Sequence, residues 1–240
     1  MIDRDVSVLK SGLDELKISY DDHMIEQTEI FYDMLVVKNK VMNLTTITDH
    51  EDFIIKHILD SLLSVRFYSF KDQKLIDVGT GAGFPGIPLK IFFPELDVTL
   101  IDSVNKKLDF INTVISELGL DNIRTIHGRA EDLAKENSCR EKFDVGVSRA
   151  VANLSVLAEL GIPFIKTDGK FIFYKAGESD EEISAAENAF AILGAGEKHI
   201  YKDRLFDTDI VRKFIIVDKN KECPGKYPRK AGVPSKQPLQ

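Results

Sequence analysis

Cysteine is scarce in this sequence, since the 240 residues include only Cys139 and Cys223. Both lie among polar neighbours, so the sequence indicates no disulfide framework and favours a reducing compartment. Long hydrophobic runs are also missing: no apolar stretch approaches the roughly 18 residues that suggest a membrane span. The N-terminal MIDRDVSVLK is charged and lacks the apolar core of a secretory signal. The expected protein is therefore cytoplasmic and has no membrane partner.

An excess of positive charge is missing too. The net charge of −7 argues against broad nonspecific binding to nucleic acid. Residues 219–240 are the exception, because they hold six basic residues and four prolines against one acid, Glu222. Two interpretations stay open for this segment. It is either a loosely ordered, solvated end or a contact for a polyanion such as RNA.

The apolar pattern divides the chain into three parts within one structural domain. Residues 1–70 show helical spacing and predict a helical extension packed on the core, with a helix over about 22–40 and another opened by a Thr48–Glu51 capping box. Residues 71–218 alternate between strands and helices and form the predicted core. Residues 219–240 form the basic, proline-rich tail. In the core, helices are predicted over 152–166 and over 180–193, the second opened by a Ser179–Glu182 capping box.

The core is expected to contain a doubly wound, mostly parallel α/β sheet, because short loops separate the alternating elements. The predicted strands are 74–78, 97–102, 123–127, 143–148, 170–175, 197–202 and 211–218.

The stretch Lys74–Phe93 organises the core. A buried strand is followed by glycines at alternate positions, Gly79, Gly81 and Gly83, and then by an apolar helix. Strand, glycine-rich turn and helix open many nucleotide-binding α/β sheets. Glycine suits such a turn because it adopts conformations closed to other residues and lets a ligand approach the main chain.

Two ligands compete for this turn. Gly81–Gly86 fits the dinucleotide fingerprint G-x-G-x-x-G, whereas Asp77–Gly83 fits D-x-G-x-G-x-G, the glycine loop of S-adenosylmethionine (SAM) methyltransferases. A carboxylate at the strand end would repel a pyrophosphate but favour the sulfonium and ammonium of SAM. The pattern therefore favours SAM over a nicotinamide cofactor. A tight turn without any ligand is the third interpretation.

Ligands of doubly wound sheets lie outside the carboxyl ends of the strands, and this rule selects further residues. Asp102 ends the second predicted strand and is placed to accept both ribose hydroxyls, although a helix N-cap would explain it as well. Ala130 and Glu131 follow the third strand and are placed to meet adenine. Ser148–Ala150 follow the fourth strand and face the methyl donor.

Several catalytic signatures are absent. The fourth strand is not followed by Asn-Pro-Pro-Tyr, which is expected for methylation of an exocyclic amine, or by a cysteine that could add to a pyrimidine. The five histidines are scattered, so no metal site is predicted. An acceptor with a free lone pair, such as guanine N7, needs no general base, and positioning and desolvation would then supply most of the rate.

The sequence resembles the RsmG family, once called GidB. The resemblance is carried by six stretches that span nearly the whole chain: Val78–Leu89, Asn39–Thr45, His57–Leu62, Arg129–Glu131, Ser148–Val151 and Tyr227–Ser235. It implies a Rossmann-like class I SAM-dependent methyltransferase. It also implies a monomeric, cytoplasmic enzyme that acts on N7 of a guanine (position 527) of 16S ribosomal RNA in the small ribosomal subunit or its assembly intermediate.

The resemblance also implies roles for individual residues. The implied cofactor-binding residues are Gly79, Phe84, Asp102, Ser103, Val104, Ala130, Glu131 and Arg149. Arg149 and Lys175 are the candidates for positioning the reactants, and Lys175, Arg229 and Lys230 those for contacting RNA. His57 and Asp60 either shape the pocket or serve the core. The chain departs from the expected Lys-Gly after the fifth strand, where it has Lys175-Ala-Gly177. A nicotinamide-dependent reductase and a noncatalytic SAM-binding regulator remain as alternatives.

Overall fold

The computed structural model describes residues 4–149 and 151–239. Seven strands form one sheet in the order β3-β2-β1-β4-β5-β7-β6. Their bounds are Lys74–Val78 (β1), Asp97–Asp102 (β2), Ile123–His127 (β3), Phe143–Arg149 (β4), Ile165–Ala176 (β5), Ala195–Arg204 (β6) and Val211–Lys219 (β7). Strands β1 to β5 are parallel, and β7 is antiparallel to both β5 and β6. The predicted doubly wound, mostly parallel α/β fold is therefore confirmed.

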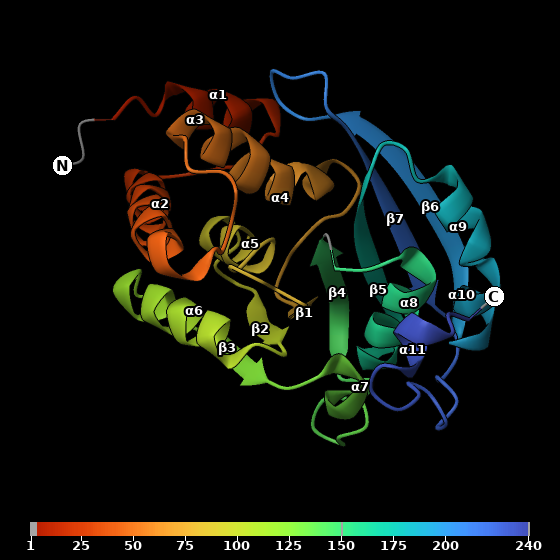
Figure 1. Ribbon diagram of the computed structural model, residues 1–240. Coiled ribbons are helices and arrows are strands. Elements are labelled where there is room, and N and C mark those ends of the chain that lie inside the picture. The colour runs from red at the N-terminus through yellow and green to blue at the C-terminus, as the bar shows by residue number, and fades with distance from the viewer. Residues whose placement is uncertain (1–3, 150, 240) are drawn as a thin grey trace.

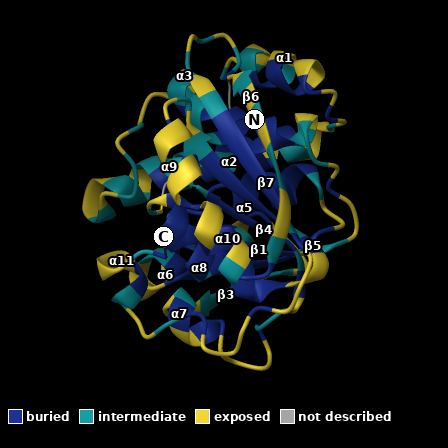
Figure 2. Ribbon diagram, turned by 90° about the vertical axis from the view of Figure 1, so that its right-hand side faces the viewer, coloured by how far each residue is buried: buried dark blue, intermediate teal, exposed yellow. Residues whose placement is uncertain are grey.

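Helices cover both faces of this sheet (Figure 1). Within the core the helices are α5 (Gly86–Phe92), α6 (Asn105–Glu117), α7 (Ala130–Leu133), α8 (Leu154–Gly161), η3 (Ile162–Phe164), α9 (Asp180–Ala185) and α10 (Glu187–Ile192). Alternate residues of each strand pack against different helices. Leu75 of β1 belongs to the cluster that includes α5 and α6, whereas its neighbour Ile76 belongs to the cluster that includes α7 to α10. The central strands β1, β2 and β4 are thus buried on both sides, and exposed residues lie on the outer surfaces of helices such as α9 and α10 (Figure 2).

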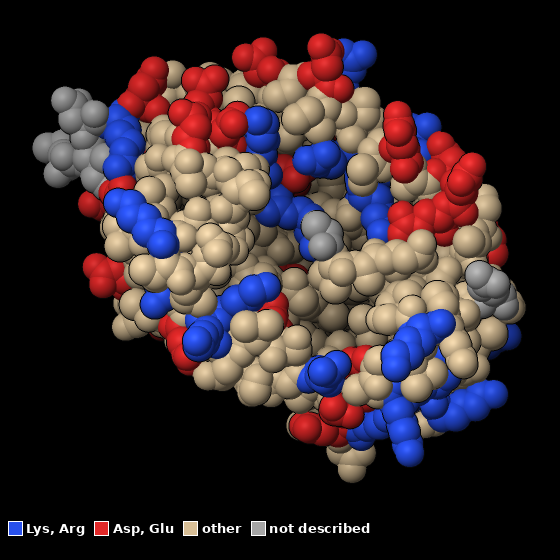
Figure 3. Space-filling view, viewed as in Figure 1, with Lys and Arg blue, Asp and Glu red and all other residues tan. Residues whose placement is uncertain are grey.

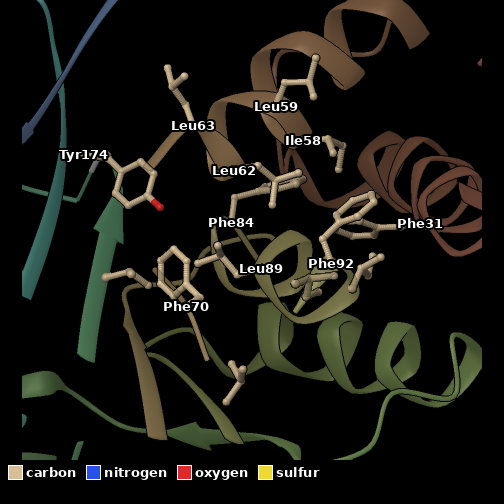
Figure 4. Packing of buried hydrophobic residues seen from close by; sticks show 14 of the residues in the cluster. Phe31, Ile58, Leu59, Leu62, Leu63, Phe70, Phe84, Leu89, Phe92 and Tyr174 are labelled. Atoms are coloured by element: carbon tan, nitrogen blue, oxygen red, sulfur yellow. The ribbon is translucent and has the colours of Figure 1, made fainter. Parts of the chain in front are cut away.

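The part of the chain before β1 forms a helical extension. It consists of α1 (Ser7–Glu15), α2 (Asp22–Met42), α3 (His50–Phe53), the π-helical turn η1 (Ile54–Leu59), α4 (Asp60–Leu62) and the 3₁₀ turn η2 (Leu63–Arg66). Figure 4 shows Phe31, Leu62, Phe84 and Leu89 gathered between these helices and α5. The rings of Phe31 and Phe84 lie with their centroids 5.2 Å apart. Because Phe84 comes from the glycine-rich turn, the extension packs directly on that turn.

Three helix predictions need correction. The helix predicted over 152–166 ends at Gly161 and gives way to η3, because Pro163 follows and Ile165 pairs with Phe143 as the start of β5. The N-cap of α3 is Asp49 and not Thr48, since the Asp49 side chain accepts from the N–H of Asp52. The segment predicted as one helix over 180–193 is two, and Ser179 makes no capping hydrogen bond.

The basic tail is docked on the α8 side of the sheet. Lys219 is buried and its Nζ lies 2.7 Å from Glu141 Oε1, and Tyr227 belongs to the core cluster of that face. A short helix, α11 (Val233–Lys236), follows. Cys139 and Cys223 are buried and unpaired. Among the residues that the structure describes, no helix is long and apolar enough to cross a bilayer.

Candidate cofactor and active site

A cavity of about 570 Å³ lies at the carboxyl ends of β1 to β4. Figure 3 shows its mouth near the middle of one face. Its lining includes all eight residues expected to bind the cofactor, Gly79, Phe84, Asp102, Ser103, Val104, Ala130, Glu131 and Arg149. A larger hollow of about 1060 Å³ lies before β1 and β2, at the opposite edge of the sheet. Ligands of such sheets bind at the carboxyl edge, so the smaller cavity is the candidate site.

The glycine-rich turn presents its main chain to this cavity. Gly79 and Gly81 have φ values of +74° and +62°, which side chains rarely tolerate. A Cβ at Gly79 would lie 2.6 Å from Cγ2 of Val151, whereas a Cβ at Gly81 would enter open space. Gly81 therefore leaves room that a ligand can fill. Its N–H is fixed by Asp102, whose Oδ2 accepts it at 3.0 Å.

Asp77 has a different role from the one expected. It is completely buried and does not line the cavity. Its Oδ2 accepts from the Thr80 hydroxyl at 2.8 Å and from the Gly86 N–H at 2.9 Å, while Oδ1 has no partner among the described residues. Burial raises the pKa of Asp77 to about 7. Through these two hydrogen bonds, Asp77 stabilises the glycine-rich turn from the side that faces away from the cavity.

The cavity has two carboxylates of its own, Asp102 and Glu131, and both side chains are largely buried. Asp102 Oδ1 accepts from the Val104 N–H at 2.8 Å, and Oδ2 accepts from Gly81. A carboxylate has about four acceptor sites, so Asp102 can still accept hydroxyl groups from the cavity. The Glu131 Oε1 atom accepts from the Gly232 N–H at 2.9 Å. Two fixed carboxylates and an open glycine turn fit the ribose and adenine of SAM.

A buried charge cluster lies behind Phe84 at the other end of the cavity. Asp60 accepts from Arg149 Nη1 at 3.0 Å and from Arg212 Nε at 2.8 Å. Figure 3 shows basic side chains along the upper rim of the hollow. The guanidinium carbon of Arg149 lies 5.1 Å from the centre of the Phe84 ring. Because Arg149 and Arg212 share the single carboxylate of Asp60, the cluster carries a net positive charge. The hydrogen bond to Asp60 holds Arg149 at the cavity wall.

The π-helical turn η1 makes this arrangement possible. In an α-helix the N–H of Asp60 would bond the carbonyl of Lys56, but here it is directed at the carbonyls of His57 and Ile55. The Lys56 carbonyl is thereby released, and it accepts from Arg149 Nη1 at 3.3 Å. The π turn thus supplies both a carbonyl and, at its end, the Asp60 carboxylate to one arginine.

His57 is held in one neutral form. Arginine only donates hydrogen bonds, so the contact of 3.1 Å from Arg149 Nη2 makes His57 Nδ1 an acceptor. His57 Nε2 then carries the proton and donates to Thr45 Oγ1 at 2.8 Å. Burial, reinforced by Arg149, lowers the pKa of His57 to about 3. The ring stacks on Phe84 with centroids 4.3 Å apart, so His57 supports that wall of the cavity.

The residues expected to contact RNA lie in different settings. Lys175 donates to the Ala152 carbonyl at 2.7 Å and pairs with Glu182, so it braces the loop after β4. Arg229 is paired with the buried Glu159 of α8. Lys230 is exposed. Ala150, which the sequence placed facing the methyl donor, lies outside the described residues.

Sequence reasoning missed several residues of the site. Arg212 carries no local signal, because it is one of two adjacent basic residues near the start of β7 and matches no motif. Lys107 lines the cavity, with its Nζ 4.0 Å from Asp102 Oδ2, and its place in the first turn after β2 could have indicated it. Ser235 of the tail also lines the cavity. The docked tail therefore reaches the candidate site.

The chain matches the family model "GidB: rRNA small subunit methyltransferase G" over residues 24–207. It is 49% identical over 237 residues to the ribosomal RNA small subunit methyltransferase G of Lachnoclostridium phytofermentans, covering 98% of each chain. It is 44% identical over 234 residues to the protein of that name from Alkaliphilus metalliredigens, covering 97% of this chain and 98% of that one.

Solved structures show the same fold at low sequence identity. A methyltransferase from Pyrococcus furiosus superposes with a TM-score of 0.53 at 15% identity, over 82% of this chain and 98% of that one. The fold is thus the Rossmann-like fold of class I methyltransferases. Matches at 49% and 44% identity over nearly the whole length establish the family independently of the fold. The chain belongs to the GidB family, the rRNA small subunit methyltransferase G family.

Proposed function

We propose that this protein transfers the methyl group of SAM to N7 of a guanine in 16S ribosomal RNA of the small subunit, and that it does so as a cytoplasmic monomer. The observation that carries the proposal is the cavity at the carboxyl ends of β1 to β4, which is lined by every residue expected to bind the cofactor. Membership of the GidB family supports ribosomal RNA as the acceptor.

The residues of the cavity suit this chemistry. Bound SAM would supply a methyl group made electrophilic by its sulfonium. Asp102 and Glu131 are proposed to hold the ribose and adenine, and the glycine-rich turn to let the cofactor approach the main chain. Arg149 and Phe84 line the same cavity, and they are proposed to orient the guanine and exclude water.

The reaction is proposed to need no general base. Guanine N7 has no proton to lose, so the transfer requires no group that accepts one. His57 has both ring nitrogens engaged and a pKa lowered to about 3. Arg149 only donates. His57 and Arg149 are therefore assigned to positioning.

The rate of methyl transfer should accordingly depend little on pH. Single-turnover methylation with saturating RNA is expected to be nearly flat from about pH 6.5 to 8.5, a window that a catalytic histidine would cross. A tenfold rise across this window that disappears in His57→Gln would make His57 the base. The pKa of Asp77, about 7, also lies in this window, so titration of Asp77 behind the glycine-rich turn could itself bend the pH–rate curve. Asp77→Asn removes that titration and is the control.

The decisive experiment is methyl transfer from labelled SAM to small subunits that lack the modification. Nucleoside analysis should recover the label as 7-methylguanosine. Recovery on another atom would reject the proposed acceptor. SAM binding without any transfer would favour a noncatalytic regulator, and binding of NADH in place of SAM would favour the reductase.

Exposed lysines of the tail are proposed to contact RNA phosphates. Figure 3 shows basic side chains gathered over α11 and its neighbourhood. Replacing Lys226, Lys230 and Lys236 with glutamine should leave SAM affinity unchanged but weaken binding to small subunits. The slope of log affinity against log salt should fall by about 0.7–0.9 for each lost phosphate contact. Filter binding at several salt concentrations measures that slope.

The matched control removes the same charge from the opposite edge of the sheet. Lys17, Lys71 and Lys142 are exposed there, near the starts of β1 and β4. Their triple glutamine variant should bind small subunits with the normal slope. If both triple variants lower the slope equally, the tail has no special part in RNA binding.

A further inference from the structure

A buried ion pair fixes the tail to the core. Arg229 Nε donates to both oxygens of Glu159 at 2.9 and 3.1 Å, and Nη2 donates to Oε2 at 2.6 Å. The backbone N–H of Arg229 donates to the same carboxylate at 2.7 Å. Glu159 is completely buried on α8. Because a buried carboxylate without a partner is costly, this pair strongly favours one position for the tail.

Three residues further on, the tail reaches the cofactor cavity. Gly232 has a φ of +81°, a conformation that favours glycine, and its N–H points to Glu131 Oε1. Glu131 Oε2 has no hydrogen-bond donor among the residues that the structure describes. Ser235 lines the same cavity. One cavity carboxylate thus has one oxygen bound to the tail and the other left for a ligand.

We propose that Ser235 and the main chain at Gly232 form a wall of the cofactor site, and that Arg229 and Gly232 are positioning residues that act through Glu131. The inference rests on the proposed function, since the ligand is SAM. The Gly232 N–H fixes the orientation of the Glu131 carboxylate, and the Arg229–Glu159 pair fixes Gly232. Binding free energies are reciprocal, so a cofactor that needs the docked tail must in turn hold the tail in place.

Limited trypsin digestion of the full chain tests this coupling. Lys230 and Lys236 are exposed cleavage sites on either side of Gly232, and Arg204 is an exposed site at the β6–β7 connection. SAM at about ten times its dissociation constant should slow cleavage after Lys230 and Lys236 by up to about tenfold. Cleavage after Arg204 should not change. Mass spectrometry of the early fragments distinguishes the sites.

The outcomes separate this inference from the function on which it rests. Calorimetric SAM binding to the intact protein without protection of Lys230 and Lys236 overturns the coupling and leaves the proposed function standing. Protection that extends equally to Arg204 also overturns it, because it would report global stability alone. Failure of the intact protein to bind SAM overturns both.

Variants of the ion pair provide a second measurement. Arg229→Gln should raise the SAM dissociation constant about tenfold and remove the protection by SAM. Arg229→Lys should retain part of the SAM affinity and part of the protection from trypsin. Lysine keeps the positive charge but lacks the planar guanidinium that donates two parallel hydrogen bonds to a carboxylate. Lys221→Gln, which removes an exposed charge earlier in the tail, should change neither. An Arg229→Gln protein that binds SAM normally and retains the protection would show that the pair does not position the site.

Discussion

Replacing Asp102 with alanine is expected to weaken SAM binding about ten- to a hundredfold, because hydrogen bonds to a charged group contribute about 1.5–3 kcal/mol. The carboxylate faces the cavity and also fixes the N–H groups of Gly81 and Val104. The alanine variant therefore loses both the contact with the cofactor and the support of the glycine-rich turn. Isothermal titration with SAM measures the effect.

Two variants control this experiment. Asp102→Asn keeps the shape and one acceptor oxygen, so its affinity should lie between those of the wild type and the alanine variant. Asp97→Ala changes an aspartate at the other end of β2, where the side chain pairs with Arg124, and should bind SAM normally. Normal SAM affinity in a folded Asp102→Ala protein would exclude Asp102 from the cofactor site.

Asp77 is expected to make stability depend on pH. The folded protein keeps the Asp77 proton up to about pH 7, whereas an unfolded chain loses it near 3.8. The folded state therefore binds more protons across this window, and the contribution of Asp77 to stability falls as the pH rises from 3.8 to 7. Between pH 5 and 8 the loss should be about 2–3 kcal/mol.

Asp77→Asn should remove this loss. Urea unfolding at pH 5 and pH 8 measures it: relative to the wild type, the variant should gain about 2–3 kcal/mol in unfolding free energy at the higher pH. Asp109→Asn, at an exposed position on α6, should follow the wild type at both pH values. The same pH dependence in the wild type and in Asp77→Asn would mean that the buried carboxyl does not retain its proton.

Local pattern was sufficient to predict most of the sheet. The bounds of β1, β2 and β3 agree with prediction, because each is a short run enriched in apolar residues and bounded by polar or turn residues. The boundary between η3 and β5 was not predictable in this way. Ile165 continues an apolar helical pattern, and only its pairing with Phe143 on the neighbouring strand makes it extended.

The cavity lining was predictable for a geometric reason: parallel strands bring their carboxyl ends to one edge, so residues after β1 to β4 must converge. The contacts that hold the lining residues in place were not predictable. Asp60 lies 89 residues from Arg149 and 152 from Arg212, and Glu131 lies 101 residues from Gly232. Contacts between residues so far apart in the sequence produce no periodic pattern of residue types. The one available signal was Glu159, an acidic residue within the apolar helix α8. A buried carboxylate needs a partner, so Glu159 predicted a cationic residue nearby.

The π turn η1 constrains the length of the chain as well as its side chains. A π turn differs from an α-helix by one extra residue in the turn, and each helical residue rotates the following side chains by about 100°. Deleting any one residue of Ile54–Leu59 would restore a regular α-helix and swing Asp60 away from Arg149 and Arg212. Substitutions there are tolerable where packing allows, but insertions and deletions are not. In working relatives the length of this segment should therefore be constant.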